Sequence, residues 1–348
     1  MTLGVPASTT ANRAGVGEVL LEVRDLRTQF HVMDGVVKAV DGVSFSLRKG
    51  GRLALVGESG CGKSVTALSI MRLIEIPPGR FAGGEILFNG RDLLKLSDRE
   101  IRKVRGGEIA MIFQEPMTSL NPVLSVGSQI VEAIQLHQHV DGRQAREIAR
   151  QALSDVGVAD AKRRLTQYPH ELSGGMRQRV MIAMALSCNP SLIIADEPTT
   201  ALDVMVQAQV LRLLNDLQRE LGLAMLFITH DLSVLVEICD RLAIMYAGRI
   251  VEEGPSQEVF ERPAHPYTEA LAAAFPSIGD QRFRRNPSGL GGDPPQPDAV
   301  PSGCSFHPRC PVAFEACPDT VPDLYPAGEG RRAACLLVPQ GTEAKVGS

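Results

Sequence analysis

A glycine-rich stretch, GESGCGKS at residues 57–64, carries the clearest chemistry in the sequence. It matches the pattern GxxxxGKS, which ends in a lysine and a serine. Glycines let consecutive backbone N–H groups converge on phosphate oxygens, the lysine reaches the outer phosphates, and the serine hydroxyl can ligate Mg2+. The pattern predicts a site for a nucleotide and Mg2+, and a plain glycine-rich turn is the alternative. The residues expected at this site are Gly57, Glu58, Ser59, Gly60, Cys61, Gly62, Lys63, Ser64 and Val65.

Two adjacent acids, Asp196 and Glu197, follow an apolar run in LIIADEP at residues 192–198. The run predicts a buried strand, and the carboxyl ends of strands form the usual ligand edge of an open α/β sheet. We expect Asp196 to hold Mg2+, directly or through water. Glu197 points elsewhere and suits a general base that orients water for attack on the γ-phosphate of ATP. Adjacent acids can also merely cap a helix, but here they follow a phosphate loop.

Gln114 and His230 each follow another apolar run, IAMIF and AMLFI respectively. We expect Gln114 to contact both Mg2+ and the attacking water, and His230 to meet the γ-phosphate as a neutral donor. Either residue alone could be an ordinary polar cap at a strand end. Their order and spacing relative to the phosphate loop favour catalytic roles.

A second glycine-rich segment, LSGGMRQ at residues 172–178, lies within a stretch expected to form an inserted helical subdomain at about residues 125–190. Because this segment lies on a separate insertion, it is too far along the chain to bind the phosphates held by Lys63. The sequence therefore predicts that a second subunit completes the ATP site.

The elements that position these residues follow from the apolar pattern. Alternating apolar residues between 19 and 56 predict strands, one of which, LALV, leads directly into the phosphate loop. A helix is expected from residue 64 until just before Pro77 and Pro78. In the helical insertion, Ile148, Ala152, Leu153 and Val156 form the expected apolar stripe, with Gly157 at its end.

Beyond the insertion, strands and helices alternate. We expect strands at residues 192–195 and 224–228, a helix at residues 204–221 ending at Gly222, and a hairpin over residues 242–254 that turns at Ala247 and Gly248. This order is typical of an α/β fold with a mainly parallel sheet.

Composition excludes several classes of protein. The 348 residues carry a net charge of −4, so there is no general basic field for nucleic acid. No apolar run reaches the roughly 20 residues that span a bilayer. Residues 1–17 lack the apolar stretch of a secretory signal, and we expect a disordered arm there. We therefore expect a protein that is soluble or peripheral to a membrane.

Four of the seven cysteines lie near the end of the sequence, after a segment rich in proline and glycine at residues 287–303 that we expect to act as an extended tether. An ATP site suggests a reducing compartment, where thiols stay free or bind metal. The spacing is unlike that of paired zinc knuckles. Four thiolates suffice for a [4Fe-4S] cluster, while zinc and reduced thiols remain alternatives. These residues are Cys304, Cys310, Cys317 and Cys335.

The sequence resembles the ATP-binding cassette (ABC) ATPases over residues 19–254, through LSGGMRQRV, Gln114, TALD (200–203) and His230. The resemblance implies a P-loop NTPase fold with antiparallel strands at the N-terminus and a helical signature subdomain. It also implies a head-to-tail dimer, in which Ser173, Gly174 and Gly175 face the γ-phosphate on the partner and Asp203 couples the two sites. Phe30 lies where the family places an aromatic that stacks on adenine, and a core phenylalanine is the alternative.

Two further segments, residues 113–130 and HPYTEAL at residues 265–271, look like those of ATPase subunits from bacterial peptide and nickel importers. This resemblance implies two transmembrane permease subunits, a second ATPase subunit that more often gives a heterodimer than a homodimer, and an extracytoplasmic solute-binding protein. It places the chain at the cytoplasmic face of the membrane, with Met117 to Val126 as the docking surface or, alternatively, as a buried loop. Some members hold a [4Fe-4S] cluster in a tail similar to GCSFHPRC.

The expected organisation is therefore an arm at residues 1–17, a nucleotide-binding domain at residues 18–264 and a C-terminal extension at residues 265–348, whose cysteine-rich tail spans residues 304–335. The expected function is ATP-driven import of dipeptides or oligopeptides, with nickel and glutathione also open as solutes. A soluble ABC ATPase that acts on nucleic acid or ribosomes is the alternative, and a redox-sensing tail that gates transport is a third hypothesis.

Overall fold

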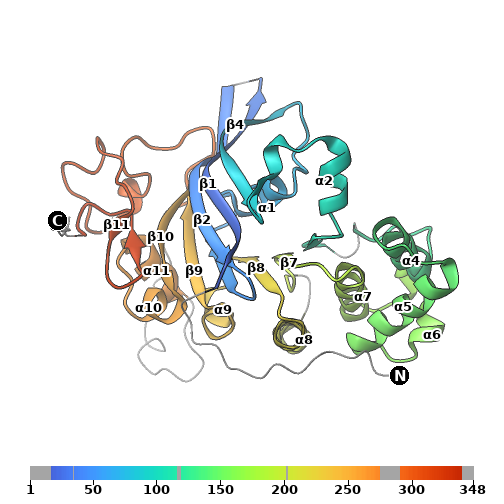
Figure 1. Cartoon of the computed structure of the whole chain (residues 1–348). Coiled ribbons are helices and arrows are strands. Elements are labelled where there is room, and N and C mark those ends of the chain that lie inside the picture. Colours follow the sequence, from blue (N-terminus) through green and yellow to red (C-terminus); the bar gives the residue numbers. More distant parts are fainter. Residues whose placement is uncertain (1–16, 34, 116–118, 201–202, 275–290, 339–348) are drawn as a thin grey trace, which may run out of the picture.

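The computed structural model describes residues 17–33, 35–115, 119–200, 203–274 and 291–338, and in these ranges the strands form two sheets (Figure 1). The predicted arm at residues 1–17 lies almost wholly outside this part of the chain. The smaller sheet is antiparallel, and β1 is paired on both sides, by β2 and by β4. Its strands, in spatial order, are β2 (Gly35–Arg48), β1 (Val19–Val32), β4 (Gly79–Phe88) and β5 (Arg91–Asp92).

The larger sheet is parallel at its centre, as the sequence predicts, because β9, β3, β8, β7 and β6 all run in the same direction. Antiparallel strands extend only one of its edges. In spatial order, the strands in the described residues are β11 (Tyr325–Pro326), β12 (Arg332–Ala333), β10 (Arg249–Pro255), β9 (Arg241–Tyr246), β3 (Arg52–Val56), β8 (Ala224–Thr229), β7 (Leu192–Asp196) and β6 (Ile109–Ile112).

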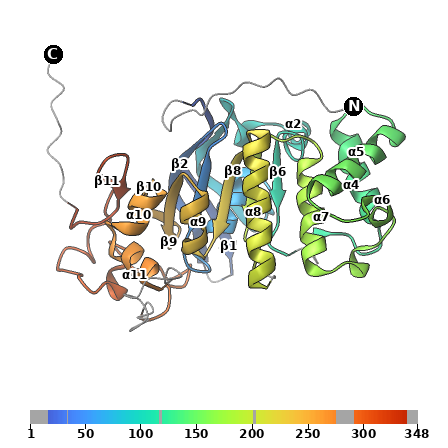
Figure 2. The same ribbon diagram turned by 90° about the horizontal axis from the view of Figure 1, so that it is seen from below.

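The central strands are apolar on both faces because each face is covered. In β3, Leu53 and Leu55 pack into a core shared with the small sheet, whereas Ala54 and Val56 pack into a core on the opposite face. Sheets covered on both sides require such continuous apolar runs. Helix α1 (Lys63–Ile70) contacts strands of both sheets, and α8 (Val204–Leu221) and α9 (Leu232–Ile238) lie along the other face of the large sheet (Figure 2).

The helical insertion forms a lobe beside the sheets, next to β6 and β7 (Figure 1). On α5, the buried residues are Ala145, Ala149 and Leu153. The predicted stripe faces the core: Leu153 and Val156 are buried, and Ile148 and Ala152 are half-buried and pack against the same core. The elements of this lobe are α4 (Val126–His137), α5 (Gly142–Asp155), α6 (Ala161–Arg164), the 3-10 helix η2 (Pro169–Glu171) and α7 (Gly174–Leu186).

Several predicted boundaries are confirmed. Helix α8 spans residues 204–221 and ends at Gly222, whose φ of 64° is left-handed and suits glycine. The β9–β10 hairpin turns at Ala247 and Gly248, with φ of 46° and 80°. The prediction for α1 was too long: the helix ends at Ile70, and Arg72 already has a positive φ of 49°.

The C-terminal extension packs on the large sheet and its core, which corrects the expectation that residues 287–303 separate the cysteine-rich tail from the preceding domain. Strand β12 pairs with β10 through Glu252 and Ala333. Phe306, 1% exposed, packs in the main core against Tyr246 and Tyr267. Composition predicts an extended segment but cannot predict that aromatic residues beyond it dock on the sheet. The domain division at residues 264 and 265 remains a prediction.

The remaining helical elements connect these layers. Within the described ranges, no helix combines the length and the apolar character needed to cross a membrane. The remaining elements are η1 (Leu93–Lys95), α2 (Asp98–Val104), α10 (Ser256–Glu261), α11 (Pro266–Ala274) and η3 (His307–Arg309).

Candidate nucleotide-binding site

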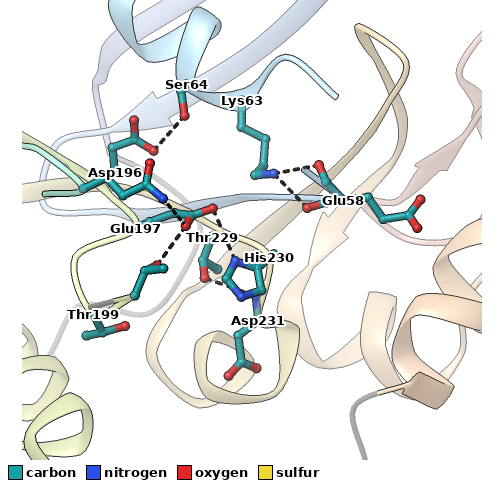
Figure 3. Close-up of polar contacts among 12 residues, drawn as sticks. Glu58, Lys63, Ser64, Asp196, Glu197, Thr199, Thr229, His230 and Asp231 are labelled. Atoms are coloured by element: carbon teal, nitrogen blue, oxygen red, sulfur yellow. Dashed lines mark hydrogen bonds and ion pairs between the residues drawn. The ribbon is translucent and has the colours of Figure 1, made fainter. Parts of the chain in front are cut away.

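The phosphate loop connects β3 to α1, so it lies at the carboxyl edge of the large sheet and at a helix N-terminus. Lys63 is 5% exposed and its Nζ donates to the carbonyl oxygens of Gly57 and Glu58 at 2.8 and 2.9 Å (Figure 3). The ammonium group therefore lies over the loop. A positive side chain and a positive helix terminus at one place form an anion site.

Two glycines of the loop are required by close backbone contacts. A Cβ at Gly57 would lie 2.2 Å from the carbonyl oxygen of Met245, which is far inside van der Waals contact. A Cβ at Gly62 would lie 2.2 Å from the carbonyl oxygen of Ala39, and its φ of 103° also favours glycine. The glycines of the pattern thus allow the loop to pack against β2 and β9.

Asp196 ends β7 and lies beside the phosphate loop because β7 and β3 both flank β8. Its Oδ1 accepts a hydrogen bond from Ser64 Oγ at 3.1 Å. Burial raises the pKa of Asp196, and the nearby negative charge of Glu197 raises it further, while Ser64 and Lys63 act in the opposite direction. A buried carboxylate beside a hydroxyl is a donor pair suited to Mg2+.

Glu197 is the meeting point of side chains that follow three neighbouring strands. Its Oε2 accepts hydrogen bonds from Gln114 Nε2 at 2.9 Å and from Thr200 Oγ1 at 2.8 Å. Its Oε1 lies 3.3 Å from Nδ1 of His230 (Figure 3). The Glu197 side chain is 14% exposed and its φ of 42° is left-handed, so its carboxylate is held in one direction.

Gln114, Glu197 and His230, which lie far apart in the sequence, are thus brought together, and the roles expected of them remain predictions. Thr200 was not predicted, although the quoted TALD segment begins with it. Its threonine hydroxyl, three residues after an acid, is the signal that could have identified it.

A cavity of about 770 Å³ lies over these groups. Phe30 and Val37 of the small sheet form part of its wall, so Phe30 is not an internal core residue. Leu271, Ala274 and Pro297 of the C-terminal extension also line it, and no motif in the sequence pointed to them. The predicted residues that line it are Phe30, Glu58, Ser59, Gly60, Gly62, Lys63, Ser64, Val65, Gln114, Glu197 and His230.

The signature residues lie elsewhere. Ser173 caps α7 by accepting a hydrogen bond from the Met176 N–H at 3.4 Å, and Gly174 and Gly175 form the first turn of that helix. Asp203 caps α8 by accepting from the Val206 N–H at 3.0 Å. Ser173, Gly174, Gly175 and Asp203 are not among the described residues that line the cavity.

The four C-terminal cysteines are close to one another. The pKa of Cys304 is raised mainly by burial and further by Cys317, Cys335 and Cys310, whose charges act on it. In the described ranges, however, no three or more His, Cys, Asp or Glu side chains are arranged to hold a metal ion. The thiols are therefore neighbours without forming a ligand set, and the predicted cluster is not confirmed.

Comparison with known proteins agrees with this geometry. Residues 40–200 match the family model for ABC transporters, and residues 251–317 match that for the C-terminal region of oligopeptide and dipeptide transporters. A probable peptide ABC transporter ATP-binding protein, y4tR, from Sinorhizobium fredii is 53% identical over 91% of this chain and 95% of its own length. The oligopeptide transport ATP-binding protein OppD from Salmonella typhimurium is 49% identical over 94% and 97%.

A solved structure extends the likeness to the fold. The ATP-binding cassette MJ0796, in a dimeric post-hydrolysis state bound to ADP and Pi, aligns with a TM-score of 0.61 and 26% identity over 68% of this chain and 99% of its own. The chain therefore belongs to the ATP-binding subunits of ABC transporters, in the oligopeptide and dipeptide transporter group, a family that hydrolyses ATP to power transport.

Proposed function

We propose that this chain is the ATP-hydrolysing subunit of a bacterial importer that carries peptides or similar solutes across the cytoplasmic membrane. The observation that carries the proposal is the convergence of Gln114, Thr200 and His230 on Glu197, beside the phosphate loop. The names of close relatives support peptides as the solute class. The choice among dipeptides, oligopeptides, nickel and glutathione is made by the parts of a transporter that bind the solute. A role on nucleic acid is not supported, given the net charge of −4 and these relatives.

At the nucleotide, we assign the phosphate loop of residues 57–65 to the phosphates, through its backbone, Lys63 and Ser64 and not through the Glu58 carboxylate, and we assign Phe30 to the adenine. Lys63 and the loop N–H groups are suited to the β- and γ-phosphates. Ser64 and Asp196 would hold Mg2+ together with Gln114, since Ser64 Oγ lies 3.1 Å from Asp196 Oδ1. When bound, Mg2+ neutralises charge on the phosphate oxygens.

Glu197 is assigned as the general base. Its carboxylate would accept a proton from the water that attacks the γ-phosphorus, while the bond to the ADP oxygen breaks. Gln114 and His230 contact this carboxylate at 2.9 and 3.3 Å, so they would orient it and the water. We also assign His230, whose side chain is 51% exposed, as a donor to the γ-phosphate.

A second ATPase subunit would complete each site. Ser173, Gly174 and Gly175 lie at the N-terminus of α7, where N–H groups suit a phosphate on a partner subunit. Asp203, at the start of α8, would couple the two sites. A heterodimer, two transmembrane permeases and an extracytoplasmic solute-binding protein complete the proposed assembly, which places this chain at the cytoplasmic face of the membrane.

The docking surface for the permeases is assigned to Met117 to Val126. Residues 116–118 lie outside the described part of the chain. In the remainder, Val123 is 76% exposed and Leu124 is 39% exposed, which supports a contact surface over a buried loop.

A [4Fe-4S] cluster on Cys304, Cys310, Cys317 and Cys335 remains a proposal, supported by the closeness of the thiols. Because these thiols do not form a ligand set as they stand, ATP hydrolysis is assigned to the residues around the phosphate loop alone. Iron and sulfide analysis of anaerobically purified protein would separate a cluster from zinc and from bare thiols.

Uptake measurements test the proposed function. Cells that lack their own copy of this chain should regain uptake of labelled peptides when they express the natural chain, but not when they express Glu197→Gln. Glu220→Gln, which alters an exposed glutamate on α8, serves as the matched control. Full uptake with Glu197→Gln would contradict the proposal.

A further inference from the structure

A single arginine of the C-terminal extension holds the phosphate loop. Arg309 Nη1 donates to Glu58 Oε2 at 2.8 Å, and Nη2 donates to Glu58 Oε1 at 3.1 Å. The two residues are 251 positions apart, and Glu58 is the second residue of the loop. Bidentate pairing of this kind fixes direction as well as charge.

Arg309 is itself held on several sides. Its side chain is 7% exposed, and that of Glu58 is 24% exposed. Nη1 also lies 3.3 Å from the Tyr246 hydroxyl, Nε donates to the Gly291 carbonyl at 3.1 Å, and the guanidinium lies over the Tyr246 ring. The Glu58 hydrogen bond is the main factor that raises the pKa of Arg309. The ion pair is therefore shielded and fixed, unlike an exposed surface pair.

The backbone of Glu58 is held by the same extension. Its N–H donates to the hydroxyl of Tyr267 at 2.9 Å, and its carbonyl accepts from Lys63 Nζ at 2.9 Å. Tyr267 belongs to the HPY segment, and Arg309 to the GCSFHPRC segment. Residues from both segments thus contact Glu58, which also contacts Lys63, the lysine expected to bind phosphate.

The charge of Glu58 gives this contact a consequence for the site. Glu58 lines the proposed nucleotide cavity, and a carboxylate there repels the negative phosphates. Figure 3 draws its carboxylate on the side of the loop away from Asp196 and Glu197. We infer that Arg309 is a positioning residue for the ATP site, because it neutralises the Glu58 carboxylate and fixes it away from the phosphates.

This inference rests on the proposed ATP site and is tested with the full chain and Mg·ATP in equilibrium binding. Arg309→Gln should weaken affinity about tenfold, a size typical of coupling between sites. Raised salt should reduce this deficit, since screening weakens the repulsion by the unpaired carboxylate. The double variant Arg309→Gln/Glu58→Gln should recover most of the affinity. A purely structural anchor would leave the double variant as weak as the single one, at every salt concentration, and would overturn the inference.

Two further variants test whether loss of any ion pair, or failure to fold, explains a change in ATP affinity. Arg332→Gln removes another ion pair between the extension and the sheet, to Glu253 at 2.9 Å from Nε, and should leave ATP affinity as in the natural chain. If Arg309→Gln does not fold, Arg309→Lys keeps the charge without the bidentate pair, and Glu58→Gln added to Arg309→Lys should raise the affinity toward that of the natural chain. No gain from the added Glu58→Gln in a folded chain would overturn the inference. A natural chain that binds no Mg·ATP would instead refute the proposed function, whereas equal binding by the natural chain and Arg309→Gln would refute this inference alone.

Discussion

The side-chain amide of Gln114 donates a hydrogen bond to the carboxylate of Glu197, with 2.9 Å between nitrogen and oxygen. Gln114 follows β6 and Glu197 follows β7, so the pairing of these neighbouring strands brings the two side chains together. A residue expected to contact the attacking water thus touches the residue expected to activate it. The strand order of the sheet therefore determines the geometry of the proposed catalytic centre.

Glu197→Gln should lower ATP turnover about 100-fold or more, because it removes the base and keeps the groups that bind phosphate. The amide has nearly the same shape, so the contacts with Thr200 and Gln114 are perturbed little. Phosphate release measures turnover, and retention of labelled ATP measures binding. Turnover close to that of the natural chain would remove Glu197 from this role.

Lys63→Ala should weaken nucleotide binding itself. Lys63 is 5% exposed, and its ammonium lies against the carbonyl groups of Gly57 and Glu58, positioned to pair with phosphates. Hydrogen bonds to charged groups contribute roughly 1.5–3 kcal/mol, so affinity should fall by at least tenfold. Titration with Mg·ATP measures the change, and Lys162→Ala, at an exposed lysine of α6, is the matched control. Unaltered affinity in Lys63→Ala would argue against the phosphate assignment.

Ser173→Ala should impair the ATP site on the partner subunit. In mixed dimers with one altered chain, the ATP site that faces the altered α7 should lose hydrolysis. The other ATP site keeps all of its binding residues. The substitution also removes a helix cap, which costs about 1 kcal/mol. Ser97→Ala removes the cap of α2 and serves as the control for that loss. Equal loss with both variants would show that only stability had changed.

Phe306→Ala should destabilise the ATPase core, although the residue lies in the C-terminal extension. Its ring packs against Tyr246, Tyr267 and His265. Truncation of a buried phenylalanine costs about 3–5 kcal/mol. Chemical denaturation measures the free energy of unfolding, and Phe314→Ala, at a ring that is 42% exposed, should cost far less. If the two variants had the same stability, the extension would not be part of the core.

Stability should fall as pH is lowered from about 6.5 to about 4 because of His265. Burial lowers the pKa of His265 from 6.5 to about 4. In that window the unfolded chain binds the proton and the folded chain does not, so acid favours unfolding by up to about 3 kcal/mol. Burial raises the pKa of the adjacent Glu252, so proton uptake by this carboxylate acts in the opposite direction as the pH falls.

The contribution of His265 is isolated by comparing slopes. His265→Gln cannot take up the proton, so its free energy of unfolding should vary less with pH between about 4 and 6.5 than that of the natural chain. Denaturation at several pH values gives both slopes. Parallel slopes would exclude His265 as the source, whatever the absolute stability of the variant.

Much of the local structure followed from residue patterns because its causes are local. The helix at residues 204–221 ends where a glycine can adopt a left-handed φ, and the hairpin turns at Ala247 and Gly248. In α5, the small residues Ala145 and Ala149 are fully buried, whereas the larger Ile148 is half-buried and packs against the same core. Side-chain size alone does not reveal how deeply each position of a helix is buried.

The sequence by itself determined the phosphate loop, the paired acids and the signature segment, because each needs particular residue types at short, fixed spacing. Only the tertiary structure decided that the extension adds strands to the large sheet and that Tyr267 and Arg309 both contact Glu58. Such contacts join residues up to 251 positions apart. They depend on strand order and on the packing of buried aromatic rings, and no local pattern encodes either.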